Sequence, residues 1–222
     1  MVMGSEISVQ DKFWGAVRWA DAAALRKALQ DGADAQEWRG PQGHALMALG
    51  EEWLRRRGTN PSLPTWYATE EVDACVQMLL QAGLDPQGRD GHGRTTLHNS
   101  FLYMAASPQV LERLIERGLD VNACDNVGAT PAHACAYGGR AEMAEVLKKA
   151  GADFSARTAN VYNEPIHMAA TYGNTAMIDW LLSQGYSLFR PNGERVLAAE
   201  MWLCREEGLA SLAQAVAHVR AA

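Results

Sequence analysis

Three histidines recur at an almost constant spacing in the 222-residue chain. His98, His133 and His167 lie 35 and 34 residues apart, and each ends a similar tetrapeptide: Thr-Thr-Leu-His, Thr-Pro-Ala-His and Glu-Pro-Ile-His. Repeated imidazoles can form a metal site or an acid–base pair. Helices of neighbouring repeats, however, lie about 8–10 Å apart, whereas nitrogen binds zinc at about 2 Å. The spacing therefore argues against one shared metal ion and favours a structural role. The remaining histidines are isolated and are assigned no chemistry: His44, His92 and His218.

The four cysteines offer no recognisable reactive motif. They are scattered without a C-x-x-C pair: Cys75, Cys124, Cys135 and Cys204. We expect reduced thiols that pack as small apolar groups, with a reactive Cys–His pair as the less favoured alternative. The sequence also lacks the G-x-S-x-G, P-loop, H-E-x-x-H and dinucleotide-binding motifs. We therefore predict a protein that is not an enzyme and carries no cofactor.

Composition narrows the classes of partner. Hydrophobic residues make up 48% of the chain and charged residues 21%, which is typical of a globular protein. The net charge of −6 argues against nucleic-acid binding, which requires a basic surface, and favours a basic protein partner. Residues 1–10 lack a basic start and a long apolar run, so we expect a disordered N-terminus without a signal peptide. We expect no membrane span and a cytoplasmic location.

A Gly-x-Asp tripeptide recurs along the chain and predicts the elements that position these residues. Its glycines are Gly32, Gly83, Gly118, Gly151 and, in a degenerate copy, Gly185. The intervals between them are 51, 35, 33 and 34 residues. Each glycine follows an apolar-periodic stretch, where a helix can end in a left-handed residue. Each repeat is therefore predicted to contain a turn, a helix, a second turn, a second helix and a glycine stop.

The Gly-x-Asp tripeptides and the histidine tetrapeptides recur with similar periods. In this the sequence resembles the ankyrin-repeat family, whose repeat has about 33 residues and a T-P-L-H-x-A signature. The resemblance implies an all-α ankyrin solenoid of about six helix-turn-helix units with short β-turn or hairpin connections. It also implies that each signature histidine caps its own repeat by bonding turn backbone. The cleanest copy is Asp125 to Arg157. The predicted single domain, 11–222, comprises an N-cap repeat (11–40), repeats 41–89, 90–124, 125–158 and 159–192, and a C-cap repeat (193–222).

Two repeats are predicted to be irregular. Repeat 90–124 has two extra residues, which we place between its helices around Ala106–Pro108. Repeat 41–89 has an insertion at 57–68, where one glycine and two prolines argue against a regular helix. Because Trp66 and Tyr67 lie in this insertion, we expect an ordered loop. This loop either contributes to partner binding or packs over its own repeat.

Large rings recur near the ends of the predicted first helices. In the ankyrin family these positions and the turn tips line the concave binding surface; the alternative is that the rings fill the core between repeats. Aromatic anchors are common in protein interfaces. The predicted partner-binding residues are Trp19, Arg39, Glu51, Glu52, Trp53, Trp66, Tyr67, His92, Arg94, Tyr103, Asn126, Tyr137, Asn160, Tyr172 and Trp202.

The resemblance implies a non-enzymatic protein-binding module. Among specific roles we favour a bacterial immunity protein that neutralises a cognate secreted toxin, because the chain is acidic and has no predicted catalytic domain or export signal. A basic toxin would match the charge of the chain. The alternative is an adaptor or host-directed effector that recruits a cellular protein. We expect a monomer, or a heterodimer with the partner.

Overall fold

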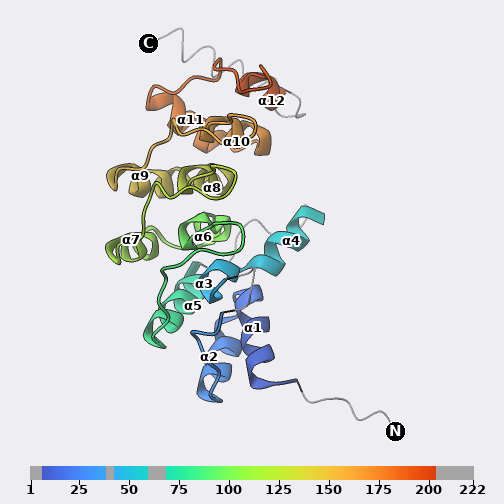
Figure 1. The fold of residues 1–222 in the computed structure, drawn as a ribbon, viewed down its shortest axis with the longest axis vertical. Coiled ribbons are helices and arrows are strands. Elements are labelled where there is room, and N and C mark those ends of the chain that lie inside the picture. The colour runs from blue at the N-terminus through green and yellow to red at the C-terminus, as the bar shows by residue number, and fades with distance from the viewer. Residues whose placement is uncertain (1–6, 39–42, 60–68, 204–222) are drawn as a thin grey trace. The chain divides into compact units, whose positions relative to one another are not determined.

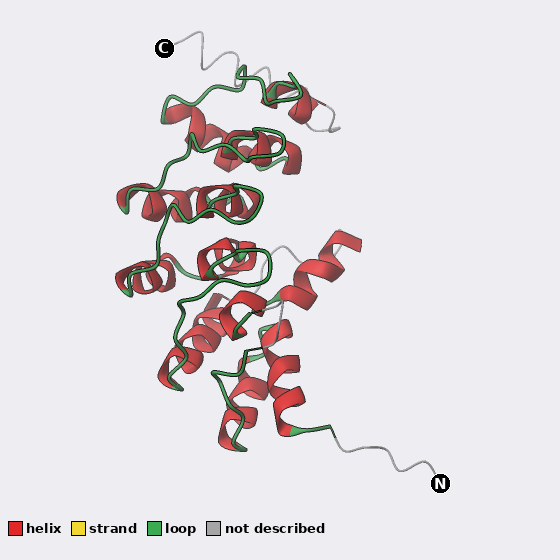
Figure 2. Cartoon of the chain, viewed as in Figure 1, coloured by secondary structure: helices red, strands yellow, loops and turns green. Residues whose placement is uncertain are grey.

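The computed structural model describes residues 7–38, 43–59 and 69–203 (Figure 1). The chain divides into two compact units, residues 1–119 and 120–222, here called the N-terminal and C-terminal units. Helices joined by loops make up the described residues of both units (Figure 2). Backbone pairing outside the helices includes an isolated bridge between Pro191 and Leu197.

The N-terminal unit begins with the helical hairpin of α1 (Val9–Trp19) and α2 (Ala22–Gln30). The next repeat contributes α3 (Ala45–Ala48), α4 (Glu51–Thr59) and α5 (Thr69–Gln81). A third repeat follows with a 3-10 turn (Thr96–His98), α6 (Ser100–Ala105) and α7 (Pro108–Glu116). The amide of Gly50, between α3 and α4, donates to the carbonyl of Val17 and so ties the first two repeats together.

The C-terminal unit contains two regular hairpins and the start of a third. Helices α8 (Pro131–Gly138) and α9 (Ala141–Lys149) form the first, and α10 (Pro165–Tyr172) and α11 (Thr175–Ser183) form the second. Helix α12 (Ala198–Leu203) packs against α10. Below, "first helix" means α1, α6, α8, α10 or α12, "second helix" means α2, α5, α7, α9 or α11, and "finger turn" means the loop before a first helix.

The five landmark glycines occupy equivalent places in successive repeats. Each lies two residues after the end of a second helix, with φ between +84° and +95°. An L side chain is strained in this left-handed region, whereas glycine is not. The glycine period therefore reports the helix ends correctly, and the predicted all-α ankyrin-type fold is confirmed.

Apolar side chains on the facing surfaces of the helices form the core. In the N-terminal unit they include Phe13, Trp14, Leu25, Leu79, Phe101 and Leu114. In the C-terminal unit they include Met143, Leu147, Phe154, Ile166, Ile178 and Leu181. Because no single hairpin can bury such a surface alone, neighbouring repeats depend on each other for stability.

The two extra residues of repeat 90–124 do not lie between its helices. The helix-to-helix connection is residues 106–107 there, the same length as 139–140 and 173–174 in the next repeats. The first-helix segment runs instead from Thr96 to Ala105, against the shorter Pro131–Gly138. Asn99 divides it, because its Oδ1 accepts from the amide of Phe101 and starts α6 separately from the 3-10 turn.

In the other irregular repeat, 41–89, the helix extends further than predicted and includes Gly58. Helix α4 continues through this glycine to Thr59, whereas the sequence predicted no regular helix in 57–68. A glycine lowers helix stability by only about 1 kcal/mol and does not forbid a helix. The rest of the insertion, 60–68, lies outside the described residues.

Candidate functional site

The three signature histidines are structural caps. Each Nδ1 accepts a hydrogen bond from the backbone N–H three residues earlier, at Thr95, Thr130 and Glu164, over 3.0–3.1 Å. The proton must then lie on Nε2, which donates to the next finger turn: His133 to Asn163 O (2.9 Å) and His167 to Arg190 O (3.0 Å). His133 and His167 therefore join consecutive repeats, and all three histidines bond the backbone of their own turns, as predicted.

His44 has a related role that the sequence did not reveal. It is buried, precedes α3, and donates from Nε2 to Pro86 O at 3.2 Å, near the end of the same repeat. Burial lowers the pKa of its imidazole, an effect partly offset by this bond. His44 does not end a tetrapeptide of this kind and does not share the spacing of the other three histidines, so the recurrence of histidine did not identify it. Its position at a helix start after Gly43 was the available signal.

An acidic or amide residue shapes three finger turns. Asp90 Oδ1 accepts from the amides of His92 and Arg94. Asp125 and Asn192 accept equivalent pairs of amide bonds in their own turns. Burial raises the pKa of Asp90, but the hydrogen bonds from Arg94 and from the His92 amide, together with the charge of Arg94, outweigh burial, so the pKa lies below its usual value. Arg94 Nη2 lies 2.8 Å from Asp90 Oδ2, so this predicted contact residue also stabilises its own turn.

The finger turn of repeat 159–192 is built differently. Glu164 replaces the signature threonine and is completely buried. Its Oε1 lies 2.9 Å from Arg157 Nη2 and 3.3 Å from Arg190 Nη1. Its Oε2 has no hydrogen-bond partner among the described residues. A buried carboxylate needs such charged partners, because desolvation of an unpaired charge is costly.

Three of the predicted binding rings belong to the core instead. Tyr103 is 0% exposed and its hydroxyl donates to Leu97 O, while Trp53 and Trp202 are 7% and 2% exposed. Tyr103 lies five residues before α7, at the place that the buried Ala136 and Ala170 occupy before α9 and α11. The ring centroids of Trp53 and Phe101 lie 5.5 Å apart. These three assignments as surface contacts are therefore wrong in this conformation.

Tyr137 and Tyr172 form an accessible aromatic pair in the C-terminal unit. Their ring centroids lie 4.3 Å apart in an edge-to-face arrangement. Tyr172 is 44% exposed and Tyr137 is half-buried. The pair is held by rigid backbone, since Asn174 Nδ2 donates to the carbonyls of Ala136 and Tyr137 between the two repeats. The structure thus brings two of the predicted residues together.

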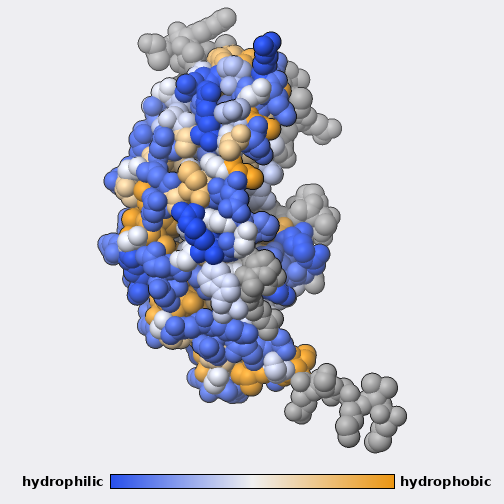
Figure 3. Space-filling model, in the orientation of Figure 1, coloured by the Kyte–Doolittle hydropathy of each residue, from blue (hydrophilic) through white to orange (hydrophobic). Residues whose placement is uncertain are grey.

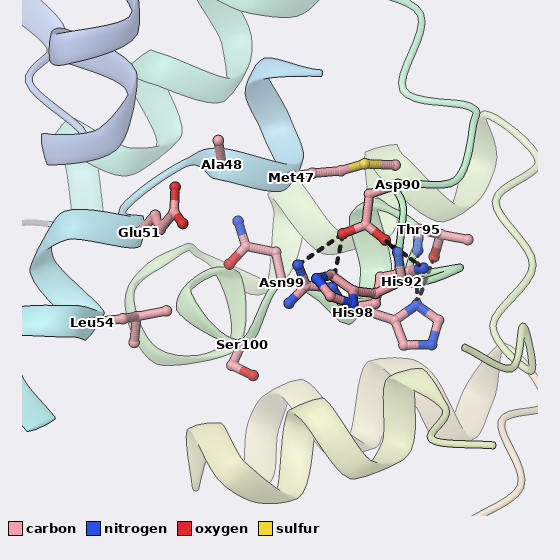
Figure 4. Close-up of a pocket in the computed structure, with 11 residues that line it drawn as sticks. Met47, Ala48, Glu51, Leu54, Asp90, His92, Thr95, His98, Asn99 and Ser100 are labelled. Atoms are coloured by element: carbon pink, nitrogen blue, oxygen red, sulfur yellow. Dashed lines mark hydrogen bonds and ion pairs between the residues drawn. The ribbon is translucent and has the colours of Figure 1, made fainter. Parts of the chain in front are cut away.

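A pocket of about 260 Å³ opens in the N-terminal unit between α3, α4 and the finger turn before α6 (Figure 4). Glu51 lies on one side, Asp90 and His92 lie on the other, and Asn99 lies between them. Asn99 Nδ2 donates to two backbone carbonyls of the α3 segment and so fixes the pocket floor. The predicted residues that line this pocket are Glu51, His92 and Arg94.

The other predicted residues are separate from these two features. Trp19, at the end of α1, is 37% exposed, and Asn126 and Asn160 are exposed in finger turns. Glu52 forms a bidentate ion pair with Arg55 on α4, at 2.6 and 2.8 Å. Hydrophilic residues cover most of the surface in view in Figure 3, and apolar residues there form small groups. The predicted residues that lie outside the described part of the chain are Arg39, Trp66 and Tyr67.

Burial disfavours the thiolate form of two of the described cysteines. Cys75 and Cys135 are buried; burial raises the pKa of both thiols, to about 12 for Cys75. Cys124 is exposed, and Cys204 lies outside the described residues. In the described part of the chain, no three His, Cys, Asp or Glu side chains converge in a potential metal site. The helices described there are also too short or too polar to cross a membrane.

Comparison with protein families gives the same result as the fold. The model for ankyrin repeats (3 copies) matches residues 65–158 and 101–192, which together span more than half of the chain. The matched residues include the three signature histidines and the glycine stops from Gly83 to Gly185. Ankyrin repeats are generally protein-interaction modules. The chain therefore belongs to the ankyrin-repeat family.

Proposed function

We propose that this protein binds another protein through the first helices and finger turns of its repeats, without catalysing a reaction. The observation that carries this proposal is the Tyr137–Tyr172 pair, in which Tyr172 is exposed and Tyr137 is half-buried, held on two hairpins that hydrogen bonds connect. Tyrosine is a frequent interface anchor because it buries a large area and keeps a polar hydroxyl. A rigid surface also loses little conformational entropy on binding.

The pocket beside Glu51 supports a second contact region in the N-terminal unit. Asp90 is already occupied by Arg94 and by two backbone amides. Glu51 is more available, because its side chain is half-exposed and its ion pair with Arg18 spans 3.9 Å. A basic side chain of the partner fits this environment. The net charge of −6 favours encounter with such a partner.

Within this function we favour a bacterial immunity protein that neutralises a basic secreted toxin. The acidic charge supports this role. The alternative is an adaptor or host-directed effector that recruits a cellular protein. The two roles differ in where the partner is encoded, because an immunity protein and its toxin are expected from adjacent genes.

The test is to co-express the full chain with the product of each neighbouring gene and measure complex formation by size-exclusion chromatography and calorimetry. The immunity role predicts a one-to-one complex that abolishes the toxicity of that product. Toxicity unchanged and binding undetected would reject the immunity role. Where a complex forms, loss of binding in the double variant Tyr137→Ala and Tyr172→Ala locates the contact on the first helices.

A further inference from the structure

A groove crosses the N-terminal unit between the second helices α5 and α7. Its volume is about 500 Å³. Its floor is apolar, formed by Val76, Leu80 and Val110. Its rim is polar, formed by Gln77, Gln81, Arg113, Glu116 and Arg117. The groove is made by second helices, whereas the proposed function uses first helices and finger turns.

The corresponding place in the C-terminal unit is filled by the chain itself. Trp180 of α11 is 8% exposed, and its Nε1 donates to Glu145 of α9 at 2.6 Å. Its ring packs edge-to-face on Phe154 at 4.9 Å. A tryptophan with a carboxylate partner therefore closes the space between second helices α9 and α11.

Counting back from the glycine that follows each second helix aligns the α5–α7 groove with the space between α9 and α11, residue by residue. Trp180 lies five residues before Gly185, and Arg113 lies five before Gly118. Glu145 lies six residues before Gly151, and Gln77 lies six before Gly83. The N-terminal unit thus has arginine and glutamine where the C-terminal unit has the tryptophan–glutamate pair. Arginine and glutamine leave the groove open, with hydrogen-bond donors on its rim.

The charged residues on the rim of the α5–α7 groove determine which ligand charge the groove favours. Arg113 and Arg117 lie one turn apart near the end of α7, and neither forms an ion pair within the described residues. Arginine binds carboxylates through two parallel hydrogen bonds. The single acidic residue of the rim, Glu116, leaves an excess of positive charge there.

We propose that this groove binds a protein segment in which an aromatic side chain stands beside acidic residues. The aromatic ring covers Val76, Leu80 and Val110, as Trp180 covers the equivalent floor in the C-terminal unit, and the carboxylates pair with Arg113 and Arg117. The surface is separate from the one in the proposed function, so each can fail independently.

The test uses two synthetic peptides and the full chain. One peptide has a central tryptophan flanked by aspartate and glutamate; the other replaces every acidic residue with lysine. Fluorescence anisotropy of a labelled peptide gives affinity, and ¹⁵N NMR shifts give the location. We expect the acidic peptide to bind at least about tenfold more tightly than the lysine peptide, as expected for one charge-assisted contact. Shifts should concentrate in 76–81 and 110–117.

Two groove variants and one control complete the design. The double variant Gln77→Glu and Arg113→Trp copies the C-terminal pair and fills the groove, and the double variant Arg113→Glu and Arg117→Glu reverses its charge. We expect both to weaken the acidic peptide by at least about tenfold. Arg26→Glu on α2, another exposed arginine of a second helix, should bind like the original protein. Circular dichroism checks that each variant is folded.

Three results would overturn the proposal. The first is equal affinity for both peptides, and the second is undiminished binding by both groove variants. The third is self-association of the protein, seen by analytical ultracentrifugation, that the charge-reversal variant abolishes. That last result would assign the groove to a second copy of the chain.

Discussion

The Nε2 atom of His133 lies 2.9 Å from the carbonyl oxygen of Asn163, in the finger turn of the next repeat. The same imidazole accepts the amide of Thr130 through Nδ1, so one side chain fixes its own turn and the following one. His167 repeats this arrangement with Glu164 and Arg190. Neighbouring repeats are thus joined by directional bonds in addition to apolar packing. Loss of one histidine should therefore weaken two turns.

His133→Ala should lower the free energy of unfolding by about 1–3 kcal/mol, because buried backbone groups lose their partners. Guanidinium unfolding followed by circular dichroism measures this change. The control is His92→Ala, an exposed finger-turn residue, which should change stability by less than about 0.5 kcal/mol. Unchanged stability combined with a large loss of partner affinity would show that His133 is a contact residue.

Stability should fall in mild acid because two histidines are buried in neutral form. Burial lowers the pKa of both His44 and His167 below 6.5, although carbonyl hydrogen bonds partly offset this effect. The unfolded state therefore binds more protons as the pH falls through 6.5, so the free energy of unfolding decreases there. Above about pH 7.5 these residues are neutral in both states and contribute no slope.

Denaturant titrations at several pH values measure this slope. The double variant His44→Gln and His167→Gln should show a shallower decrease, because glutamine keeps hydrogen-bonding groups but does not titrate. An identical slope in this variant would assign the acid sensitivity to other groups.

Tyr137→Ala with Tyr172→Ala should weaken partner binding while helicity stays near normal. The edge-to-face contact contributes only about 0.5–1.5 kcal/mol to the free energy of unfolding, in addition to the effect of buried apolar area. Tyr172 is also already exposed, so its removal costs little buried area. Tyr103→Ala is the matched comparison, since that ring is fully buried and its loss should cost about 3–5 kcal/mol. Collapse of helicity in the double variant would place the pair in the core.

Glu164→Ala should destabilise the C-terminal unit by about 1–3 kcal/mol, because Arg157 and Arg190 lose their shared carboxylate. The penalty is moderate since both arginines remain partly exposed to water. Glu164→Thr should lose less than Glu164→Ala, because threonine occupies the equivalent position before His133 and can bond the histidine. Thermal unfolding of the three proteins tests this order, and equal melting temperatures would contradict it.

Local sequence patterns determined the repeat, its helix ends and its histidine caps. Glycine two residues after a helix acts on backbone groups close in the chain, so spacing alone reveals the helix ends, whereas the resemblance to the ankyrin signature implied the histidine caps. The family and the all-α fold followed from these two periods.

Tertiary packing decided which side chains are accessible. Tyr103 and Tyr137 looked equivalent in sequence, but Tyr103 occupies the place of the buried Ala136, five residues before the following second helix. His44 acquired its role from Pro86, 42 residues away. Arg113, which lines the α5–α7 groove, aligns with Trp180, which is buried and bonded to Glu145 of α9 in the other unit. Exposure and cavities depend on contacts between distant segments, and a one-dimensional pattern does not specify those contacts.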